Sequence, residues 1–225
     1  MEDTFTKKHL SHFYKEVSFF LIPYLVLLAG CLTIKVIYTR EEIYFFINKL
    51  HTPWGDKVFP FFTFLGDGVA LVVFALIIGL FSYRRSFLLL TGYFMTAIVA
   101  QILKFIFDMP RPYLYFETMR GSIHYVEGIT MLSAHSFPSG HTTTAFSACI
   151  TMAYIFRKNY LDVLTLILAA CIGYSRMYLS QHFFEDVMAG SAIGVFVTMF
   201  WLYWLDNKEF LYKGAWRGGL LKKAE

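Results

Sequence analysis

The sequence has few charged residues. Asp, Glu, Lys and Arg make up 16% of its 225 residues, against about 25% in an average soluble domain. Hydrophobic residues make up 57% and aromatic residues 20%, and the mean hydropathy is +0.52. Too little polar surface remains for a soluble protein of this length. The composition therefore indicates an integral membrane protein, and the length indicates a single domain over residues 1–225.

Cysteine is also scarce. Cys31, Cys149 and Cys171 each lie inside an apolar run, and their odd number argues against a disulfide framework. Small apolar packing is the expected role of all three. No cluster of His and carboxylate residues has the pattern of a metal site. We therefore expect neither a metal ion nor another cofactor.

Uncharged apolar runs predict an all-α polytopic membrane protein with six transmembrane helices, since a spanning helix needs about 20 such residues. Gly66-Asp67-Gly68 should end a helix, which leaves Phe59–Leu65 as a packed approach segment. The aromatic, mixed segment 41–57 is typical of a membrane interface. The expected spans are Val17–Ile34, Val69–Tyr83, Ser86–Leu103, Thr142–Phe156, Val163–Tyr174 and Val187–Leu205.

The distribution of basic residues predicts the orientation. With six spans and short cytoplasmic tails at about 1–16 and 206–225, twelve of the 20 Lys and Arg residues lie on the inner side, as the positive-inside rule requires. We expect the bacterial cytoplasmic membrane. The inner residues are Lys7, Lys8, Lys15, Arg84, Arg85, Arg157, Lys158, Lys208, Lys213, Arg217, Lys222 and Lys223. The same topology brings every polar cluster described below to the outer, extracytoplasmic face.

Three cations stand at the outer ends of the predicted spans. Lys104, Arg111 and Arg176 occupy positions where a charge is costly and usually functional. Converging cations repel one another unless an anion lies between them. A guanidinium fork matches phosphate oxygens, and lysine adds a point charge. The three residues together therefore predict a phosphate site, although any one of them alone fits a membrane anchor.

Two histidine-containing segments supply reactive groups beside that site. Ser139 and Gly140 open a predicted helix, whose free N–H groups favour an anion, and His141 follows at once. His182 and Asp186 are four residues apart and share a helical face, so that the carboxylate can orient the imidazole. This pattern predicts His182 as a nucleophile and His141 as a general acid.

The remaining acidic and histidine residues are weaker candidates. Glu185 lies three residues from His182 and is a second possible partner for it. The long outer loop Tyr113–Phe137 carries two histidines that either contact substrate or are structural. Surface or interfacial positions are expected for the others. The loop histidines are His124 and His135, and the others are His9, His12 and His51.

These motifs resemble the three signature motifs of the type 2 phosphatidic acid phosphatase (PAP2) superfamily, which includes membrane lipid phosphatases and soluble vanadium haloperoxidases. The match is complete, in the right order, and has no departure at any motif position. The three motifs are Lys104-x6-Arg111-Pro112, Pro138-Ser139-Gly140-His141 and Ser175-Arg176-x5-His182-x3-Asp186.

The resemblance implies a PAP2-type helical bundle that hydrolyses a phosphate ester or diphosphate without a metal, through a phosphohistidine at the outer membrane surface. It implies that His182 is the nucleophile, Asp186 its partner and His141 the acid. It also implies a set of phosphate-binding residues, namely Lys104, Arg111, Ser139, Gly140 and Arg176.

Within the superfamily, the predicted spans favour the membrane lipid phosphatase branch. Bacterial members act on undecaprenyl diphosphate, phosphatidylglycerol phosphate or lipid A phosphates. We expect undecaprenyl diphosphate or a related isoprenoid diphosphate slightly ahead of lipid A. The expected partners are this phosphorylated lipid and the bilayer, with no nucleic acid. A lipid phosphotransferase with the same site and a non-enzymatic transporter are the alternatives, and the transporter reading expects charges deep within spans or inverted repeats, which the sequence lacks.

Overall fold

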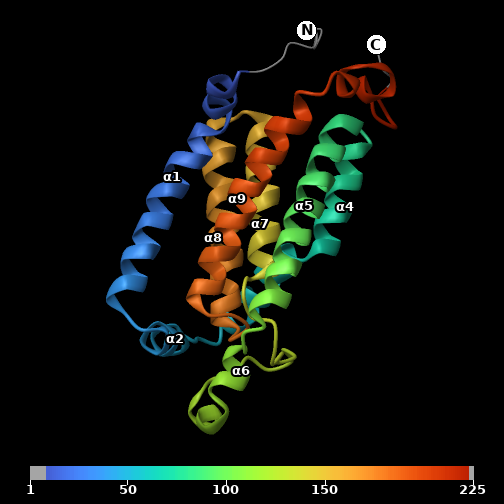
Figure 1. Cartoon of the computed structure of the whole chain (residues 1–225). Helices are drawn as coiled ribbons and strands as arrows, with labels where there is room; N and C mark the ends of the chain where they lie inside the picture. Colours follow the sequence, from blue (N-terminus) through green and yellow to red (C-terminus); the bar gives the residue numbers. More distant parts are fainter. Residues whose placement is uncertain (1–8, 223–225) are drawn as a thin grey trace.

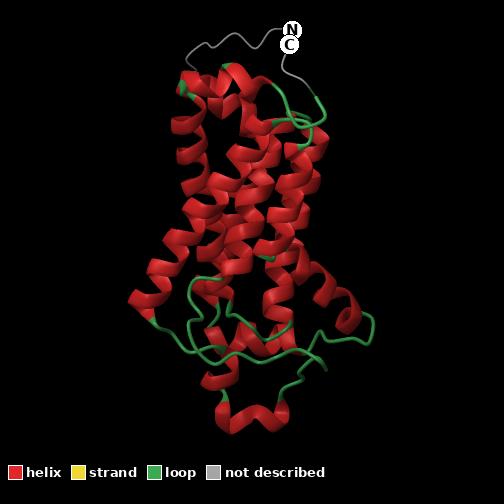
Figure 2. Ribbon diagram, turned by 90° about the vertical axis from the view of Figure 1, so that its right-hand side faces the viewer, coloured by secondary structure: helices red, strands yellow, loops and turns green. Residues whose placement is uncertain are grey.

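The computed structural model describes residues 9–222, in which all regular structure is helical (Figures 1 and 2). Lys7, Lys8 and Lys223, which entered the predicted orientation, lie outside the described residues. The elements are α1 (Leu10–Ile37), α2 (Arg40–Asn48), α3 (Gly55–Leu65), α4 (Gly68–Gly79), α5 (Tyr83–Phe107), α6 (Pro112–Tyr115), η1 (Glu117–Ser122), α7 (Gly140–Phe156), α8 (Asn159–Tyr178), α9 (Phe184–Asp206), η2 (Glu209–Tyr212) and η3 (Gly214–Arg217).

The structure confirms an all-helical membrane protein. Among the described residues, α1, α8, α9 and the segment that begins with α5 are long and apolar enough to cross a bilayer. The pair α3 and α4 is bent by 56° at the Gly66-Asp67 break and adds a fifth span if it is counted as one. Helix α7 has 17 residues and is largely enclosed by its neighbours.

Several helices differ from the predicted apolar runs. The run expected to end at Tyr83 stops earlier, because α4 ends at Gly79 and the Ser82 side chain accepts a hydrogen bond from Arg85 N, which caps the start of α5. Helices α5 and α8 instead extend past the apolar runs and include Lys104 and Arg176 in their last turns. Basic side chains are favourable at the C-terminal end of a helix, so charge does not end the helix there.

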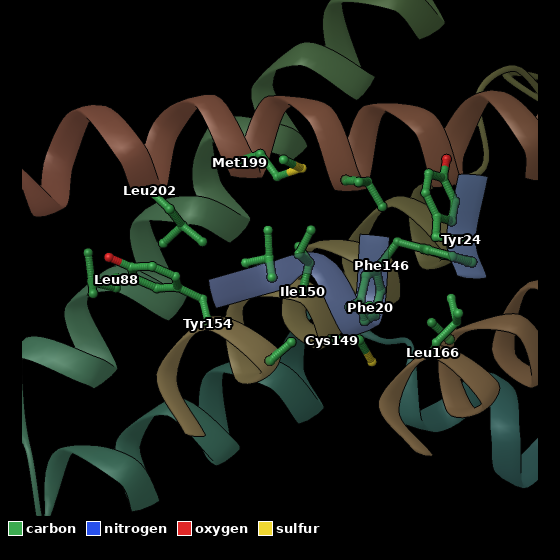
Figure 3. Close-up of a cluster of buried hydrophobic side chains, with 14 of the residues drawn as sticks. Phe20, Tyr24, Leu88, Phe146, Cys149, Ile150, Tyr154, Leu166, Met199 and Leu202 are labelled. Carbon is green, nitrogen blue, oxygen red and sulfur yellow. The ribbon is translucent and has the colours of Figure 1, made fainter. Parts of the chain in front are cut away.

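The core forms around α7, which packs against α5, α8 and α9 (Figure 1). Ile150 of α7 is fully buried among side chains from four other helices (Figure 3). Because α7 is buried on almost every side, its central position holds the surrounding helices in register. Side chains in this cluster include Phe20, Tyr24, Leu88, Phe146, Cys149, Tyr154, Leu166, Met199 and Leu202.

Glycines let α9 approach α7 closely on the side of the polar clusters. A Cβ at Gly194 would lie 2.6 Å from Thr143 O, and one at Gly190 would lie 2.6 Å from Ser139 O. Neither position admits a side chain without separating the two helix backbones. This contact brings the start of α7 beside the start of α9, where the predicted nucleophile and its partner lie.

We predict that Gly194→Ala destabilises the bundle. The added methyl group meets backbone atoms that cannot move aside, and overpacking of this kind costs about 1–3 kcal/mol. Gly30→Ala on α1 is the matched control, because a Cβ there has no neighbour within 4 Å. The melting temperatures of both variants in detergent check this. A Gly194→Ala melting temperature equal to that of Gly30→Ala would contradict the close approach.

Candidate active site

All the residues of the three motifs lie at one end of the bundle, where helices α5, α7, α8 and α9 begin or end. Lys104 lies in the last turn of α5. After that helix, Asp108 adopts a left-handed conformation with φ 37° and turns the chain toward α6. Arg111 precedes Pro112 at the start of α6, and its N–H donates to Ser133 O at 2.8 Å. The turn thus directs Arg111 back toward the centre of the bundle.

The start of α7 forms a second side of the site. Ser139 occupies the N-cap position, as predicted, but its hydroxyl accepts from the Thr142 hydroxyl at 2.9 Å instead of from a backbone N–H. The Ser139 N–H donates to Asp186 O at 3.0 Å and joins α7 to α9. A Cβ at Gly140 would meet only Lys104 Cε, at 4.0 Å. The first N–H groups of the helix therefore face an open space beside a lysine, which suits an anion.

His182 lies in the short connection between α8 and α9, with 1% of its surface exposed. Its Nε2 is 3.4 Å from Arg111 Nη1, which can only donate, so Nε2 carries the lone pair and Nδ1 the proton. Nδ1 is 3.4 Å from Asp186 Oδ2, an electrostatic contact without hydrogen-bond alignment. The same Oδ2 accepts from Ser136 Oγ at 2.5 Å and from Phe183 N at 2.9 Å. The carboxylate is thus fixed beside the protonated side of the ring.

The surroundings of His182 keep its ring neutral. Burial lowers the pKa of His182 well below its usual value, and the positive charges of Arg111, Arg176 and Lys104 lower this pKa further. A neutral ring with its lone pair on Nε2 is the form that can attack an electrophile. The ring therefore has the protonation state that the role predicted for His182 requires.

The three cations are poorly neutralised by the protein itself. Arg111 and Arg176 are 7% and 6% exposed. Arg111 donates to Ala134 O and Gln181 O, and Lys104 Nζ donates to His135 O at 2.6 Å. These partners are uncharged carbonyls, and Arg176 donates only to the Thr63 hydroxyl. Arg176 Nε is buried without a hydrogen-bond partner in the described part of the chain. A dianionic phosphate would supply both the missing charge and the missing acceptor.

His141 faces the same space from the first turn of α7. Its side chain is 30% exposed, and its Nε2 lies 3.8 Å from Asp67 Oδ2. Asp67 caps the start of α4 by accepting from Val69 N at 2.7 Å, which holds the carboxylate in place. Two histidines, one buried and one partly exposed, therefore face the region between the cations.

Several residues of the site carried no signal in the sequence. Ser136 holds Asp186, Thr63 accepts from Arg176, Gln181 accepts from Arg111, and Asp67 faces His141. Thr63 and Asp67 are far from the motifs in the chain, whereas Ser136 and Gln181 lie close to motif residues but have no pattern that predicts their contacts. Of these four residues, only Asp67 has a visible signal in the sequence, because it is a charged residue that interrupts an apolar run.

The weaker sequence candidates have other partners. Glu185 pairs with Arg40 and with Lys35, so Asp186 is the acidic residue next to His182. On the outer loop, His135 pairs with Asp108, and His124 pairs with Asp56. His12, at the start of α1 and the opposite end of the bundle (Figure 1), pairs with Glu16. Within residues 9–222, the contacts of these side chains do not include His141 or His182.

The fold and this site define a helical membrane protein with three cations and two histidines gathered at one end of the bundle. A family model described as the PAP2 superfamily matches residues 85–210. The chain belongs to the PAP2 superfamily and, within it, to the membrane lipid phosphatase branch, and it is an enzyme of the phosphatase class.

Individual relatives agree with this assignment. Phosphatidylglycerophosphatase B of Bacillus subtilis is 29% identical over 81% of this chain and 90% of its own. The crystal structure of Aquifex aeolicus LpxE has a TM-score of 0.64 and 27% identity, covering 72% of this chain and 93% of that one. A PAP2-type phosphatidylglycerolphosphate phosphatase structure from Bacillus subtilis has a TM-score of 0.60 and 27% identity, covering 86% of this chain and 96% of that one.

We predict that Ser136→Ala lowers kcat for phosphate release by about ten- to hundredfold and leaves KM nearly unchanged. A hydrogen bond to a charged group is worth about 1.5–3 kcal/mol, and its loss frees Asp186 to turn away from His182. Ser122→Ala is the control, since its exposed hydroxyl bonds only Met119 O. Steady-state kinetics on both variants measure the effect. Equal kcat values for Ser136→Ala and Ser122→Ala would show that Ser136 has no positioning role.

Proposed function

We propose that this enzyme hydrolyses a phosphate monoester or diphosphate of a membrane lipid through a phosphohistidine on His182. The observation that carries the proposal is the placement of a buried, neutral imidazole beside three cations. Its Nε2 is 3.4 Å from Arg111 Nη1, and within residues 9–222 the side-chain hydrogen bonds of the cations go to uncharged oxygens. A phosphate between them would be bound and attacked by the same arrangement. Lys104, Arg111, Ser139, Gly140 and Arg176 bind its oxygens.

The reaction proceeds in two steps. His182 Nε2 attacks phosphorus and forms the N–P bond while the bond from phosphorus to the lipid oxygen breaks. The bound phosphate dianion offsets the charges of Lys104, Arg111 and Arg176, so that His141 can carry a proton beside Asp67 and give it to that leaving oxygen. Asp186 stabilises the positive charge that develops on His182. A water molecule then gives its proton to His141 and attacks phosphorus, which releases inorganic phosphate and restores His182.

The chain is proposed to cross the membrane six times as one domain of residues 1–225. Helices α1, α5, α8 and α9, the bent pair α3–α4, and the enclosed helix α7 form the six spans. Helices α2 and α6 lie at the end that holds the site, and the start of α1 and the end of α9 lie at the opposite end (Figure 1). The basic residues favour a cytoplasmic location for the latter end, so the site faces outward in the bacterial inner membrane.

We predict that His182→Ala abolishes phosphate release and that His141→Ala lowers it by about 10²–10⁴-fold. The first variant lacks the attacking atom, and the second lacks the group that protonates the leaving oxygen. His12→Ala is the matched control, because His12 lies near the other end of α1 and pairs with Glu16. Rapid quenching with radiolabelled substrate should trap acid-labile phosphoprotein in the wild type and none in His182→Ala. Full activity in His182→Ala would overturn the mechanism.

The lipid substrate can be identified by measuring phosphate release from a panel of phosphorylated lipids. We expect the purified enzyme to release phosphate from undecaprenyl diphosphate at the highest rate, and phosphatidylglycerol phosphate and lipid A complete the panel. Product analysis with and without an acceptor lipid separates hydrolysis from phosphotransfer. A rate on another lipid at least about tenfold above that on undecaprenyl diphosphate would reassign the substrate and leave the mechanism intact.

A further inference from the structure

Three metal-ligating side chains meet outside the catalytic centre, on the same end of the molecule. They are His51 in the connection before α3, Asp56 in the first turn of α3, and His124 in the outer loop. One ligand atom of each lies within 4.8 Å of the other two, and within residues 9–222 no second trio of this kind occurs. The two histidine rings are 4.4 Å apart. The spacing in the sequence had given no sign of this cluster.

His51 has the hydrogen-bonding arrangement of a metal ligand. Its Nδ1 is 2.6 Å from Asn48 O, a group that only accepts, so Nδ1 carries the proton and Nε2 the lone pair. This Nε2 is buried and has no hydrogen-bond partner in the described part of the chain. An unmet buried acceptor costs stability. Metal-bound histidines almost always donate their other ring N–H to a carbonyl or carboxylate, as His51 does.

The other two candidate ligands are also held in place. Asp56 Oδ1 accepts from the Tyr178 hydroxyl at 2.7 Å, which leaves Oδ2 facing His124 Nε2 at 2.9 Å. The Asn48 side chain binds the backbone of His124 twice, through Nδ2 to His124 O at 2.9 Å and from His124 N to Oδ1 at 3.1 Å. The pairing of His124 with Asp56 accounts for the positions of these two side chains. It does not account for His51 Nε2, which has no hydrogen-bond partner in the described part of the chain.

We propose that His51, Asp56 and His124 bind one divalent cation of the Zn²⁺ class, with water as the fourth ligand. Imidazole and carboxylate ligands lie about 2.0–2.2 Å from Zn²⁺ in tetrahedral sites, so that neighbouring ligand atoms are roughly 3.3 Å apart. In this structure His124 Nε2 is 2.9 Å from Asp56 Oδ2, and the three ligand atoms lie within 4.8 Å of one another. Small side-chain shifts are enough to reach the spacing of a zinc site. The ion replaces the Nε2 proton of His124 and accepts the lone pair of His51. None of these three ligands takes part in the proposed hydrolysis.

The ion would join the outer loop to two other parts of the active-site end. Asp56 belongs to α3, and its partner Tyr178 ends α8, two residues after Arg176. Tyr178 also accepts from Thr52 N at 3.0 Å, beside His51. A bound cation would therefore fix the loop segment around His124 relative to α3 and α8. Its expected role is to hold the outer loop in position, whereas the phosphate chemistry belongs to the histidines.

The test measures Zn²⁺ binding to the full chain in detergent, purified without a polyhistidine tag and stripped with a chelator. Calorimetry with Zn²⁺ alone should give about one ion per wild-type chain. His51→Ala and His124→Gln should each weaken this binding at least about tenfold. His12→Ala removes a histidine far from the cluster and should bind as the wild type does. His182→Ala should also retain the ion, which separates this site from the catalytic one.

Two results would overturn the proposal. One is wild-type binding no tighter than that of His51→Ala, and the other is equal loss of the ion in His182→Ala. Co²⁺ provides a measurement that needs no variant, because a four-coordinate site with nitrogen ligands gives intense visible d–d bands. Stripped wild-type protein should develop these bands with Co²⁺ and lose them when Zn²⁺ is added. A spectrum equal to that of Co²⁺ in detergent alone would also reject the site.

Discussion

Positive charge gathered around a buried imidazole is the constraint on which the rest of this structure depends. Arg111 and Arg176 are nearly inaccessible, and both lower the pKa of His182. Burying cations without a counter-charge is costly, so the site is most stable when an anion occupies it. The same positive charges, together with burial, hold the pKa of His182 well below its usual value and keep its ring neutral. A bound phosphate of the kind proposed above would supply the missing counter-charge.

The packing of the bundle brings the ends of α5, α7, α8 and α9 together around His182. Gly190 and Gly194 let α9 contact the backbone of α7, which places Ser139 N against Asp186 O. A larger residue at either glycine would force the backbones of α7 and α9 apart. Close backbone packing through small residues is a common way for membrane helices to associate. Here it also sets the distance between the segment around Ser139 and the segment that holds His182 and Asp186.

The sequence was sufficient to predict the all-helical membrane class, the PAP2 family and the residues that gather at one end. Those predictions rest on local patterns: apolar length, charges at span ends, and the spacing of His182 and Asp186. Contacts between distant segments could not be predicted in this way. Ser136 lies just before the Pro138-Ser139-Gly140-His141 motif, but nothing in its local sequence predicts that it holds Asp186, which is 50 residues away in the chain. His51 was expected at the surface or interface, and only the fold shows its buried, unpartnered Nε2.

The outer loop is joined to the candidate site by hydrogen bonds to its backbone. Arg111 N and Nε donate to Ser133 O and Ala134 O, so the guanidinium that faces His182 is held by loop backbone. Gln181, next to His182, donates to Thr130 O at 3.1 Å. If the loop lifted away, Arg111 would lose its orientation and the nucleophile its neighbour. A cation of the kind proposed at His51, Asp56 and His124 would fix a further part of the same loop.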